Sequence, residues 1–147
     1  MMLLPNRALL AIAAVVDVAI HARPQPVAAK ALAARHQLPP RHLETLLQAL
    51  VRANILKGVR GPRGGYELAR ERRRISAGDI VRAAFEAGDE NNEGGSRLIE
   101  AVITPLVCEA GAGFLAALDR IDVDELCARA QAGAVFGKLD IKSDFTI

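Results

Sequence analysis

The stretch that decides the fold is PRHLETLLQALVRANILKGVRGPRGGYELAR, residues 40–70. Its first part carries leucines at helical spacing, which predicts a helix over about 40–53 with a buried face of Leu43, Leu46, Leu47 and Leu50. Pro40 suits the first turn of that helix, because the N–H that proline lacks would have no partner there. Asn54 suits the left-handed conformation in which many helices end.

Two short β-prone runs follow this helix and enclose a Gly/Pro-rich loop at residues 61–65. This pattern predicts a β-hairpin. Gly61, Gly64 and Gly65 let the backbone turn sharply and approach a phosphate without a side chain in the way. Arg60 and Arg63 flank the tip, where an arginine suits the negative potential of a narrow minor groove.

Two helices are predicted before residue 40. Apolar residues at helical spacing predict the first over about 6–22, and the segment Arg23–Pro26 ends it, since proline cannot continue a helix. The second is expected over about 27–36, followed by a tight connection. Helix, helix, turn, helix and a Gly/Arg-rich hairpin is the order of a winged helix-turn-helix. The fold class is therefore mainly α with a small β-hairpin wing.

Beyond the hairpin, Ser76 and Asp79 form a capping-box start for a fourth helix. The polar, Gly/Asn-rich segment Gly88–Gly95 is the expected internal boundary. Apolar residues then continue at helical spacing to residue 118, with a Thr-Pro pair at 104–105 inside the run. This pair is either a kink or, as we favour, the start of a fresh helix over about 105–119.

A last helix is expected from Asp122 to about Ala132. The predicted organisation is a winged helix-turn-helix domain at 1–87, an acidic loop with dimerisation helices at 88–132, and a C-terminal tail at 133–147.

Charge is divided unevenly along the chain. Residues 1–75 hold 13 Lys and Arg against 4 Asp and Glu, whereas residues 76–147 hold 6 against 13. A basic first half predicts contact with a polyanion. The basic run at residues 70–74 is expected to contact phosphates or to aid solubility.

Composition and motifs disfavour several classes of protein. The chain has no Gly-Lys-Ser/Thr phosphate loop, Gly-x-Ser-x-Gly elbow, His-Glu-x-x-His or Cys-x-x-Cys, so an enzyme is not expected. No apolar run is expected to cross a bilayer, because Asp17 interrupts Leu9–Ile20. A secretory leader is disfavoured by the thin basic start. Two cysteines are too few for a disulfide scaffold, which indicates a cytoplasmic protein.

Helix 40–53 is the candidate for reading base edges, because a DNA major groove accepts one α-helix. Arg41, His42 and Thr45 form its exposed set near the start. Arginine can contact guanine in bidentate fashion, and threonine can meet a thymine methyl group.

The segments HLETLLQAL (42–50), ANIL (53–56) and VRGPRGGYELAR (59–70) resemble the signature of the Rrf-two family of bacterial winged helix-turn-helix repressors. The resemblance is strong over about residues 6–87 and weaker to about 132. It implies a homodimer whose long helix crosses the partner subunit, and a palindromic operator.

The resemblance also implies the DNA-contacting residues. They are Arg41, His42, Glu44 and Thr45 on the recognition helix, Arg60, Arg63, Gly64 and Gly65 in the wing, and Asn6 and Arg7 at the basic start. The family usually has a tyrosine where His42 stands and an aromatic residue where Ala8 stands. These departures affect the expected operator preference.

Many family members hold an iron–sulfur cluster on three cysteines in the loop before the long helix. Here residues 88–104 contain no Cys and no His, so we expect no cluster and no cofactor. Cys108 and Cys127 are expected to be small buried hydrophobes, with a redox switch on these thiols as the alternative. The histidines lack metal-ligand spacing.

Together these features predict a homodimeric repressor without a cluster, acting on a palindromic operator. The predicted partners are double-stranded DNA, a second copy of the chain and a small-molecule or protein effector bound near the dimer helix or the segment Gly88–Gly95; a membrane is not among them. The alternatives are a winged-helix protein-interaction module and a thiol-based regulator using Cys108 and Cys127.

Overall fold

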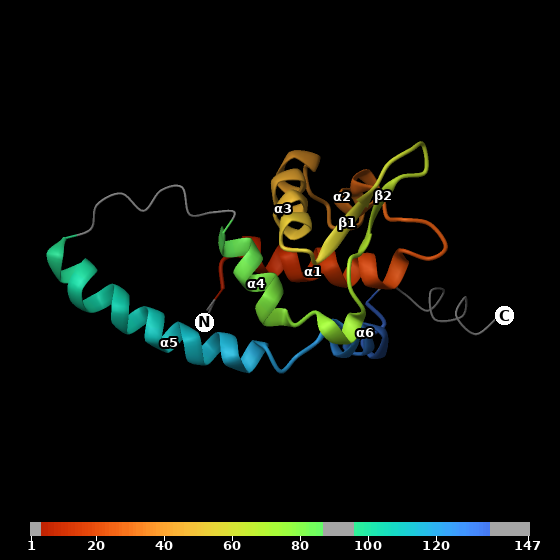
Figure 1. Ribbon diagram of the computed structural model, residues 1–147. Coiled ribbons are helices and arrows are strands. Elements are labelled where there is room, and N and C mark those ends of the chain that lie inside the picture. Colours follow the sequence, from red (N-terminus) through yellow and green to blue (C-terminus); the bar gives the residue numbers. More distant parts are fainter. Residues whose placement is uncertain (1–3, 87–95, 136–147) are drawn as a thin grey trace.

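The computed structural model describes residues 4–86 and 96–135. Helices dominate, and one two-stranded hairpin projects beside them (Figure 1). The elements are α1 (Asn6–His21), α2 (Ala29–Arg35), α3 (Pro40–Arg52), β1 (Leu56–Val59), β2 (Gly65–Leu68), a 3₁₀ turn (Arg72–Arg74), α4 (Ala77–Glu86), α5 (Thr104–Leu118) and α6 (Val123–Ala132). The fold class predicted from the sequence is confirmed. The predicted boundary segment Gly88–Gly95 and most of the predicted tail lie outside the described residues.

The core forms around α1, which packs against α2, α3, α4 and α6. The leucines predicted for α3 are buried there, and α1 adds small side chains that let its neighbours approach closely. α2 begins two residues later than predicted, because Val27 pairs with Tyr66 instead. The Val27 N–H donates to the Tyr66 carbonyl at 2.9 Å, and the Tyr66 N–H donates back at 2.8 Å.

Helix ends follow the predicted chemistry. Asn54 has a left-handed backbone, with a φ of 60°, just after α3. The Asp79 N–H donates to Oγ of Ser76 at 3.0 Å, and the Ser76 N–H donates to Oδ2 of Asp79 at 3.1 Å. Asp122 caps α6 by accepting from the Glu125 N–H at 2.8 Å. These caps satisfy backbone groups that the helices leave without partners.

The expectation of a fresh helix at Thr104–Pro105 is wrong. A π-helical turn at Ile99–Ile103 leads directly into α5, and Ile103 keeps helical backbone angles with no side-chain cap. Pro105 has no N–H to donate to the carbonyl four residues earlier, so the regular helical hydrogen bond is missing there. The turn before it is a wider, π-helical turn. The continuous helix begins near Ser96, whose Oγ accepts from the Ile99 N–H at 3.3 Å.

This continuity corrects a second expectation. The helix Ile99–Leu118 is 20 residues long and, by length and composition only, could cross a bilayer, although the sequence predicted no such run. The prediction divided this helix at the Thr-Pro pair and so underestimated its length. It extends away from the other helices (Figure 1).

α6 returns to the amino-terminal helices and completes their core. Val123 and Cys127 are buried, and the Val123 N–H donates to the Ile75 carbonyl at 2.9 Å. The turn before α6 is tied to α4 by Arg82, whose Nη1 and Nη2 donate to the Asp119 carboxylate at 2.7 and 2.9 Å. These bonds raise the pKa of Arg82 and lower the pKa of Asp119.

Candidate nucleic-acid interface

The predicted recognition helix is α3, and it separates buried from exposed side chains as the periodicity indicated. Its first turns expose four predicted DNA-contacting residues, while the intervening leucines enter the core. The exposed set is Arg41, His42, Glu44 and Thr45. Side chains near the start of such a helix can reach base edges in a major groove.

The wing is the antiparallel hairpin of β1 and β2, with Leu56 opposite Leu68 and Val59 opposite Gly65. Arg60 and Arg63 are exposed in the connection between the strands, as predicted. The backbone turns sharply at Gly61, whose φ is 118°.

Gly64 and Gly65 are needed for close backbone packing. A Cβ at Gly64 would meet the Val59 carbonyl oxygen, and one at Gly65 would meet the Val27 carbonyl oxygen. Gly65 therefore lets the wing pack directly against the segment before α2. The predicted role of these glycines in approaching phosphates stays a prediction.

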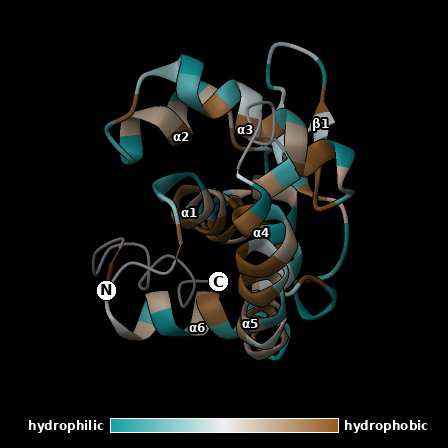
Figure 2. Cartoon of the chain, turned by 90° about the vertical axis from the view of Figure 1, so that its left-hand side faces the viewer, coloured by the Kyte–Doolittle hydropathy of each residue, from teal (hydrophilic) through white to brown (hydrophobic). Residues whose placement is uncertain are grey.

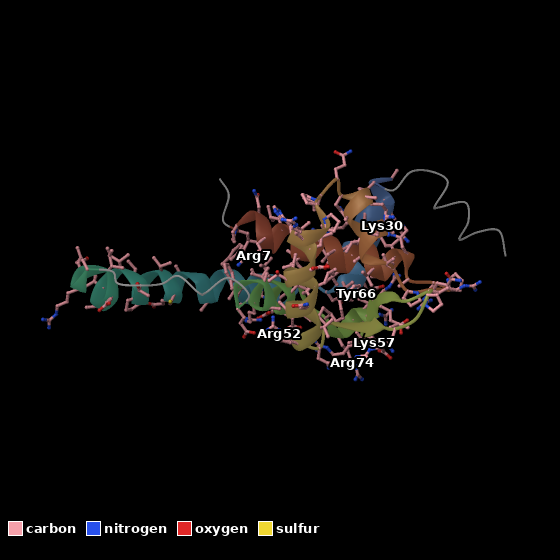
Figure 3. All side chains as sticks on the ribbon, turned by 90° about the horizontal axis from the view of Figure 1, so that it is seen from above. Arg7, Lys30, Arg52, Lys57, Tyr66 and Arg74 are labelled. Carbon is pink, nitrogen blue, oxygen red and sulfur yellow. The ribbon has the colours of Figure 1, made fainter. Side chains whose placement is uncertain are left out.

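Further basic residues surround this module. Figure 3 views it from above, with Arg7, Lys30, Arg52, Lys57 and Arg74 labelled around α3 and the wing. Asn6 and Arg7 are exposed at the start of α1, consistent with their predicted position.

Three further basic residues that were not among the predicted DNA contacts are also exposed, namely Lys30, Arg52 and Lys57. The excess of basic residues before position 75 was the signal that could have found them, because it includes all three.

Two arginines of the basic run hold the fold together. Arg70 donates from Nε to the Asn54 carbonyl at 3.0 Å and from Nη1 to the Arg74 carbonyl at 3.2 Å. Arg72 donates to the Ala19 carbonyl on α1. These bonds differ from the expected role in phosphate contact or solubility, and Arg73 and Arg74 are the exposed members of the run.

A buried ionic cluster joins α1 to the end of α2, and sequence reasoning missed it. The Asp17 side chain is fully buried and accepts from Arg35 Nε at 2.9 Å and Arg35 Nη2 at 2.7 Å. His36 Nε2 lies 2.9 Å from Oδ2 of Asp17. His21 Nδ1 lies 3.2 Å from Oδ1 and 2.9 Å from the Asp17 carbonyl oxygen. The only signal was a lone acidic residue inside the apolar stripe of α1.

An exposed recognition helix beside an arginine-tipped hairpin defines a winged helix-turn-helix DNA-binding protein. The family model Rrf2, described as an iron-dependent transcriptional regulator, matches residues 4–129. The chain belongs to this family, the one that its sequence resembled.

Relatives and solved structures agree with that family. The transcriptional regulator IscR of Serratia proteamaculans is 30% identical over 121 residues, covering 78% of this chain and 74% of its own. The protein slr0846 of Synechocystis sp. is 42% identical over 74 residues, which is 50% of each chain. The chain thus spans between half and three-quarters of the length of these relatives.

The structure of T. potens IscR superposes with a TM-score of 0.65, at 29% identity over 88% of each chain. CymR, the global cysteine regulator of B. subtilis, has the same fold with a TM-score of 0.65 at 24% identity, covering 88% of this chain and 98% of its own. IscR and CymR are named as regulators and not as enzymes. These likenesses agree with membership of the Rrf2 family of transcription regulators, the family that the sequence resembled.

The family description raises the question of an iron site. The expectation of a small buried hydrophobe is wrong for Cys108, which is exposed on α5, and is confirmed for Cys127 in α6. Burial raises the pKa of the Cys127 thiol. Within residues 4–86 and 96–135, no group of three or more His, Cys, Asp or Glu side chains is placed to hold a metal ion. The Asp17 cluster is no exception, because Arg35 occupies both carboxylate oxygens. The described donors do not fit a cysteine-ligated cluster within one chain.

Proposed function

We propose that the chain is a homodimeric repressor that binds a palindromic operator in the bacterial cytoplasm and carries no iron–sulfur cluster. The observation that supports this proposal best is the shared exposure of the first turns of α3 and of the arginine-tipped wing. Helix α3 and the wing belong to one module with a large excess of basic residues. This positive charge is suited to binding the phosphates of a DNA backbone.

The homodimer is supported by the exposed apolar surface of the long helix. Leu98, Leu106 and Val107 are each more than 60% exposed, and an exposed apolar surface of this kind marks an interaction site. Figure 2 shows the hydrophobic colouring of this helix. The exposed set is Leu98, Ile99, Val102, Ile103, Leu106 and Val107.

A second copy of the chain explains this surface better than a bilayer does. Glu100 and Glu109 lie within the apolar stretch, and a carboxylate inside hydrocarbon is costly. The carboxyl-terminal part of the helix also packs on the core through Phe114, Leu115 and Leu118, so it is not free to enter a membrane alone.

Leu106→Asp tests the dimer, because it places a charge in the middle of the exposed apolar surface. Sedimentation equilibrium should give a dimer for the wild-type chain and a monomer for the variant. Ala128→Asp, which adds the same charge on the exposed face of α6, should leave the dimer intact. Flotation of the wild-type chain with phosphatidylglycerol vesicles, or a monomeric wild-type chain, would contradict the proposal.

DNA contact is tested by Arg60→Ala and Arg63→Ala in the wing. Each should weaken operator binding, since each removes one contact with a phosphate or a groove. The slope of the logarithm of the binding constant against the logarithm of the salt concentration should become shallower by about one. Thr45→Ala should change sequence preference more than overall affinity. Arg129→Ala on α6 is the matched control and should bind as the wild type does. Binding that is indifferent to salt would instead favour the winged-helix protein-interaction module.

The absence of a cluster is supported by the donor chemistry. The loop residues 88–104 offer no Cys or His, and the two thiols lie on separate helices. Protein purified anaerobically should contain substoichiometric iron and show no visible charge-transfer absorption. Iron and sulfide at integral stoichiometry would overturn this part of the proposal.

A further inference from the structure

Among the described residues, the long helix joins the rest of the chain at its carboxyl-terminal end. Every residue from 96 to 110 is exposed, whereas Phe114, Leu115 and Leu118 pack on the core. Residues 96–110 therefore project from the other helices as an arm (Figure 1). The direction of this arm is determined where the helix ends.

The turn after the long helix is joined to the start of α4 by backbone hydrogen bonds. The Ala77 N–H donates to the Ile121 carbonyl at 2.7 Å, and the Val123 N–H donates to the Ile75 carbonyl at 2.9 Å. Both bonds lie beyond the last residue of α5. They hold the turn in place, but they do not define the direction of the helix that enters it.

That direction is held by a pair of side chains. Asp119 directly follows α5 and accepts from Nη1 and Nη2 of Arg82 on α4 at 2.7 and 2.9 Å. A bidentate pair of this kind fixes the relative orientation of its two groups. Gly78, one turn before Arg82, makes room for the pair, because a Cβ there would meet Oδ1 of Asp119.

Asp119 is poorly suited to its position without this partner. The carboxyl-terminal end of a helix carries partial negative charge, which favours cations there, yet the last turn of α5 contains no basic residue. Arg82 supplies the positive charge from α4. The two side chains are 45% and 40% exposed, and exposed ion pairs stabilise a fold little. The main effect of the pair is therefore the geometry that it imposes.

We propose that Arg82 and Asp119 are positioning residues that set the angle between the DNA-binding module and the arm, and thereby select the half-site spacing of the operator. α4 belongs to the module, since it packs against α1 and α3, whereas the arm carries the apolar surface assigned to the dimer. A change of angle at this joint moves the two recognition helices of a dimer relative to each other. Half-site selection rests on the proposed function, because it requires a dimer on two half-sites.

The length of the helix amplifies a small change of angle. The helix Ile99–Leu118 has 20 residues, which corresponds to about 30 Å. Rotating a lever of that length by about 10° displaces its far end by about 5 Å. Duplex DNA rises by about 3.4 Å per base pair. A modest rotation at the joint is therefore enough to change the preferred spacing by one base pair.

The preferred spacing is measured with synthetic operators. They carry the inverted repeat that the wild-type chain selects from a random pool, with its half-sites moved together or apart by one or two base pairs. The wild-type chain should prefer one spacing about tenfold over its neighbours, and Arg82→Ala should reduce this preference to about threefold or less. The variant should remain a dimer in sedimentation equilibrium and should bind a single half-site as the wild type does.

Three outcomes of this experiment would overturn the proposal. They are a wild-type chain that accepts all spacings equally, an unchanged preference in Arg82→Ala, and an equal loss of affinity at every spacing, which would indicate a merely structural role.

Further variants test whether the two residues act as one unit. Asp119→Ala should lose the same preference as Arg82→Ala, and the double variant should lose no more. Arg82→Lys keeps the charge but not the paired bonds, so it should restore the preference only in part. Arg129→Ala breaks an ion pair within α6 and should keep the wild-type preference. Additive losses in the double variant would contradict the pair as their cause.

The angle itself is measured without DNA. Nitroxides on Gln48→Cys in α3 and Glu100→Cys in the arm, in a Cys108→Ser background, report the distance between module and arm. Excess unlabelled chain restricts the measurement to distances within one chain. Arg82→Ala should broaden or displace the distance distribution, and Arg129→Ala should not. Identical distributions in Arg82→Ala and the wild type would overturn the joint.

The two measurements separate this inference from the proposed function. A wild-type chain that binds no duplex, or that is a monomer, would refute the proposed function and with it the selection of half-site spacing. The nitroxide distances would still decide whether Arg82 and Asp119 set the angle.

Discussion

Asp17 and Arg35 form an ion pair where α1 meets the end of α2. Asp17 is fully buried, and Arg35 donates two hydrogen bonds to its carboxylate beside the contacts of two histidines. Removing one partner of a buried ion pair leaves the other charge uncompensated. Arg35→Ala should therefore lower the free energy of unfolding by about 3 kcal/mol, measured by urea denaturation.

Arg129→Ala is the matched control for that prediction. Arg129 pairs with Glu125 at 2.6 Å, but both side chains are largely exposed. Exposed pairs contribute little, so this variant should lose at most about 0.5 kcal/mol. Similar losses of unfolding free energy in the two variants would mean that the Asp17–Arg35 pair stabilises the fold no more than an exposed ion pair does.

Cys127 should behave as an unreactive thiol. Burial raises its pKa above the ordinary value of 9.0, which reduces the thiolate available for reaction. In a Cys108→Ser variant, iodoacetamide at pH 8 should modify Cys127 far more slowly in the native chain than in urea. Equal rates in both states would favour the alternative of a redox switch.

The raised pKa of Cys127 also makes the stability of the fold depend on pH in the alkaline range. The folded chain holds the Cys127 proton more strongly than the unfolded chain, so this contribution is fully present below pH 9.0. It should decline as the pH rises from 9.0 through the raised pKa of the folded state. The loss should be absent from a Cys127→Ala variant when both are unfolded in urea across this range.

The partners of Asp17 could not be predicted from the sequence. Periodicity places Asp17 inside an apolar stripe, whereas Arg35 and His36 lie 18 and 19 residues away. Only the packing of α2 on α1 brings these groups together. The exposed residues of α3, by contrast, follow from local spacing alone.

At the scale of elements, the wing is fixed by contacts of its backbone with the segment before α2. A Cβ at Gly65 would strike the Val27 carbonyl oxygen, and Gly58 in the neighbouring strand has open space around it. Gly65→Ala should separate the hairpin from Val27, destabilise the chain by about 1–3 kcal/mol and weaken operator binding. Gly58→Ala should affect neither greatly. Denaturation and gel shifts on the two variants distinguish these outcomes.

Helix boundaries were predictable where capping groups are local, as for Ser76 and Asp122. The long helix was not, because Thr-Pro is a common helix start and the sequence alone does not reveal a π-helical turn. The unbroken helix carries one long apolar surface instead of two short ones, and this is the surface proposed above for the dimer.

At the scale of the whole molecule, the order of helices and wing could be predicted because each element has a strong local pattern. The return of α6 to α1 could not, because it depends on contacts between residues more than a hundred positions apart. Long-range packing therefore supplies the part of the core that local sequence patterns do not reveal.

We have proposed that two copies of this module bind duplex DNA through α3 and the wing. The decisive experiment is selection of bound duplexes from a random pool by the full wild-type chain. The predicted result is an enriched inverted repeat with half-site centres about 10 base pairs, or a multiple of that spacing, apart. A pool that shows no enriched sequence after selection in low-salt buffer would contradict the claim.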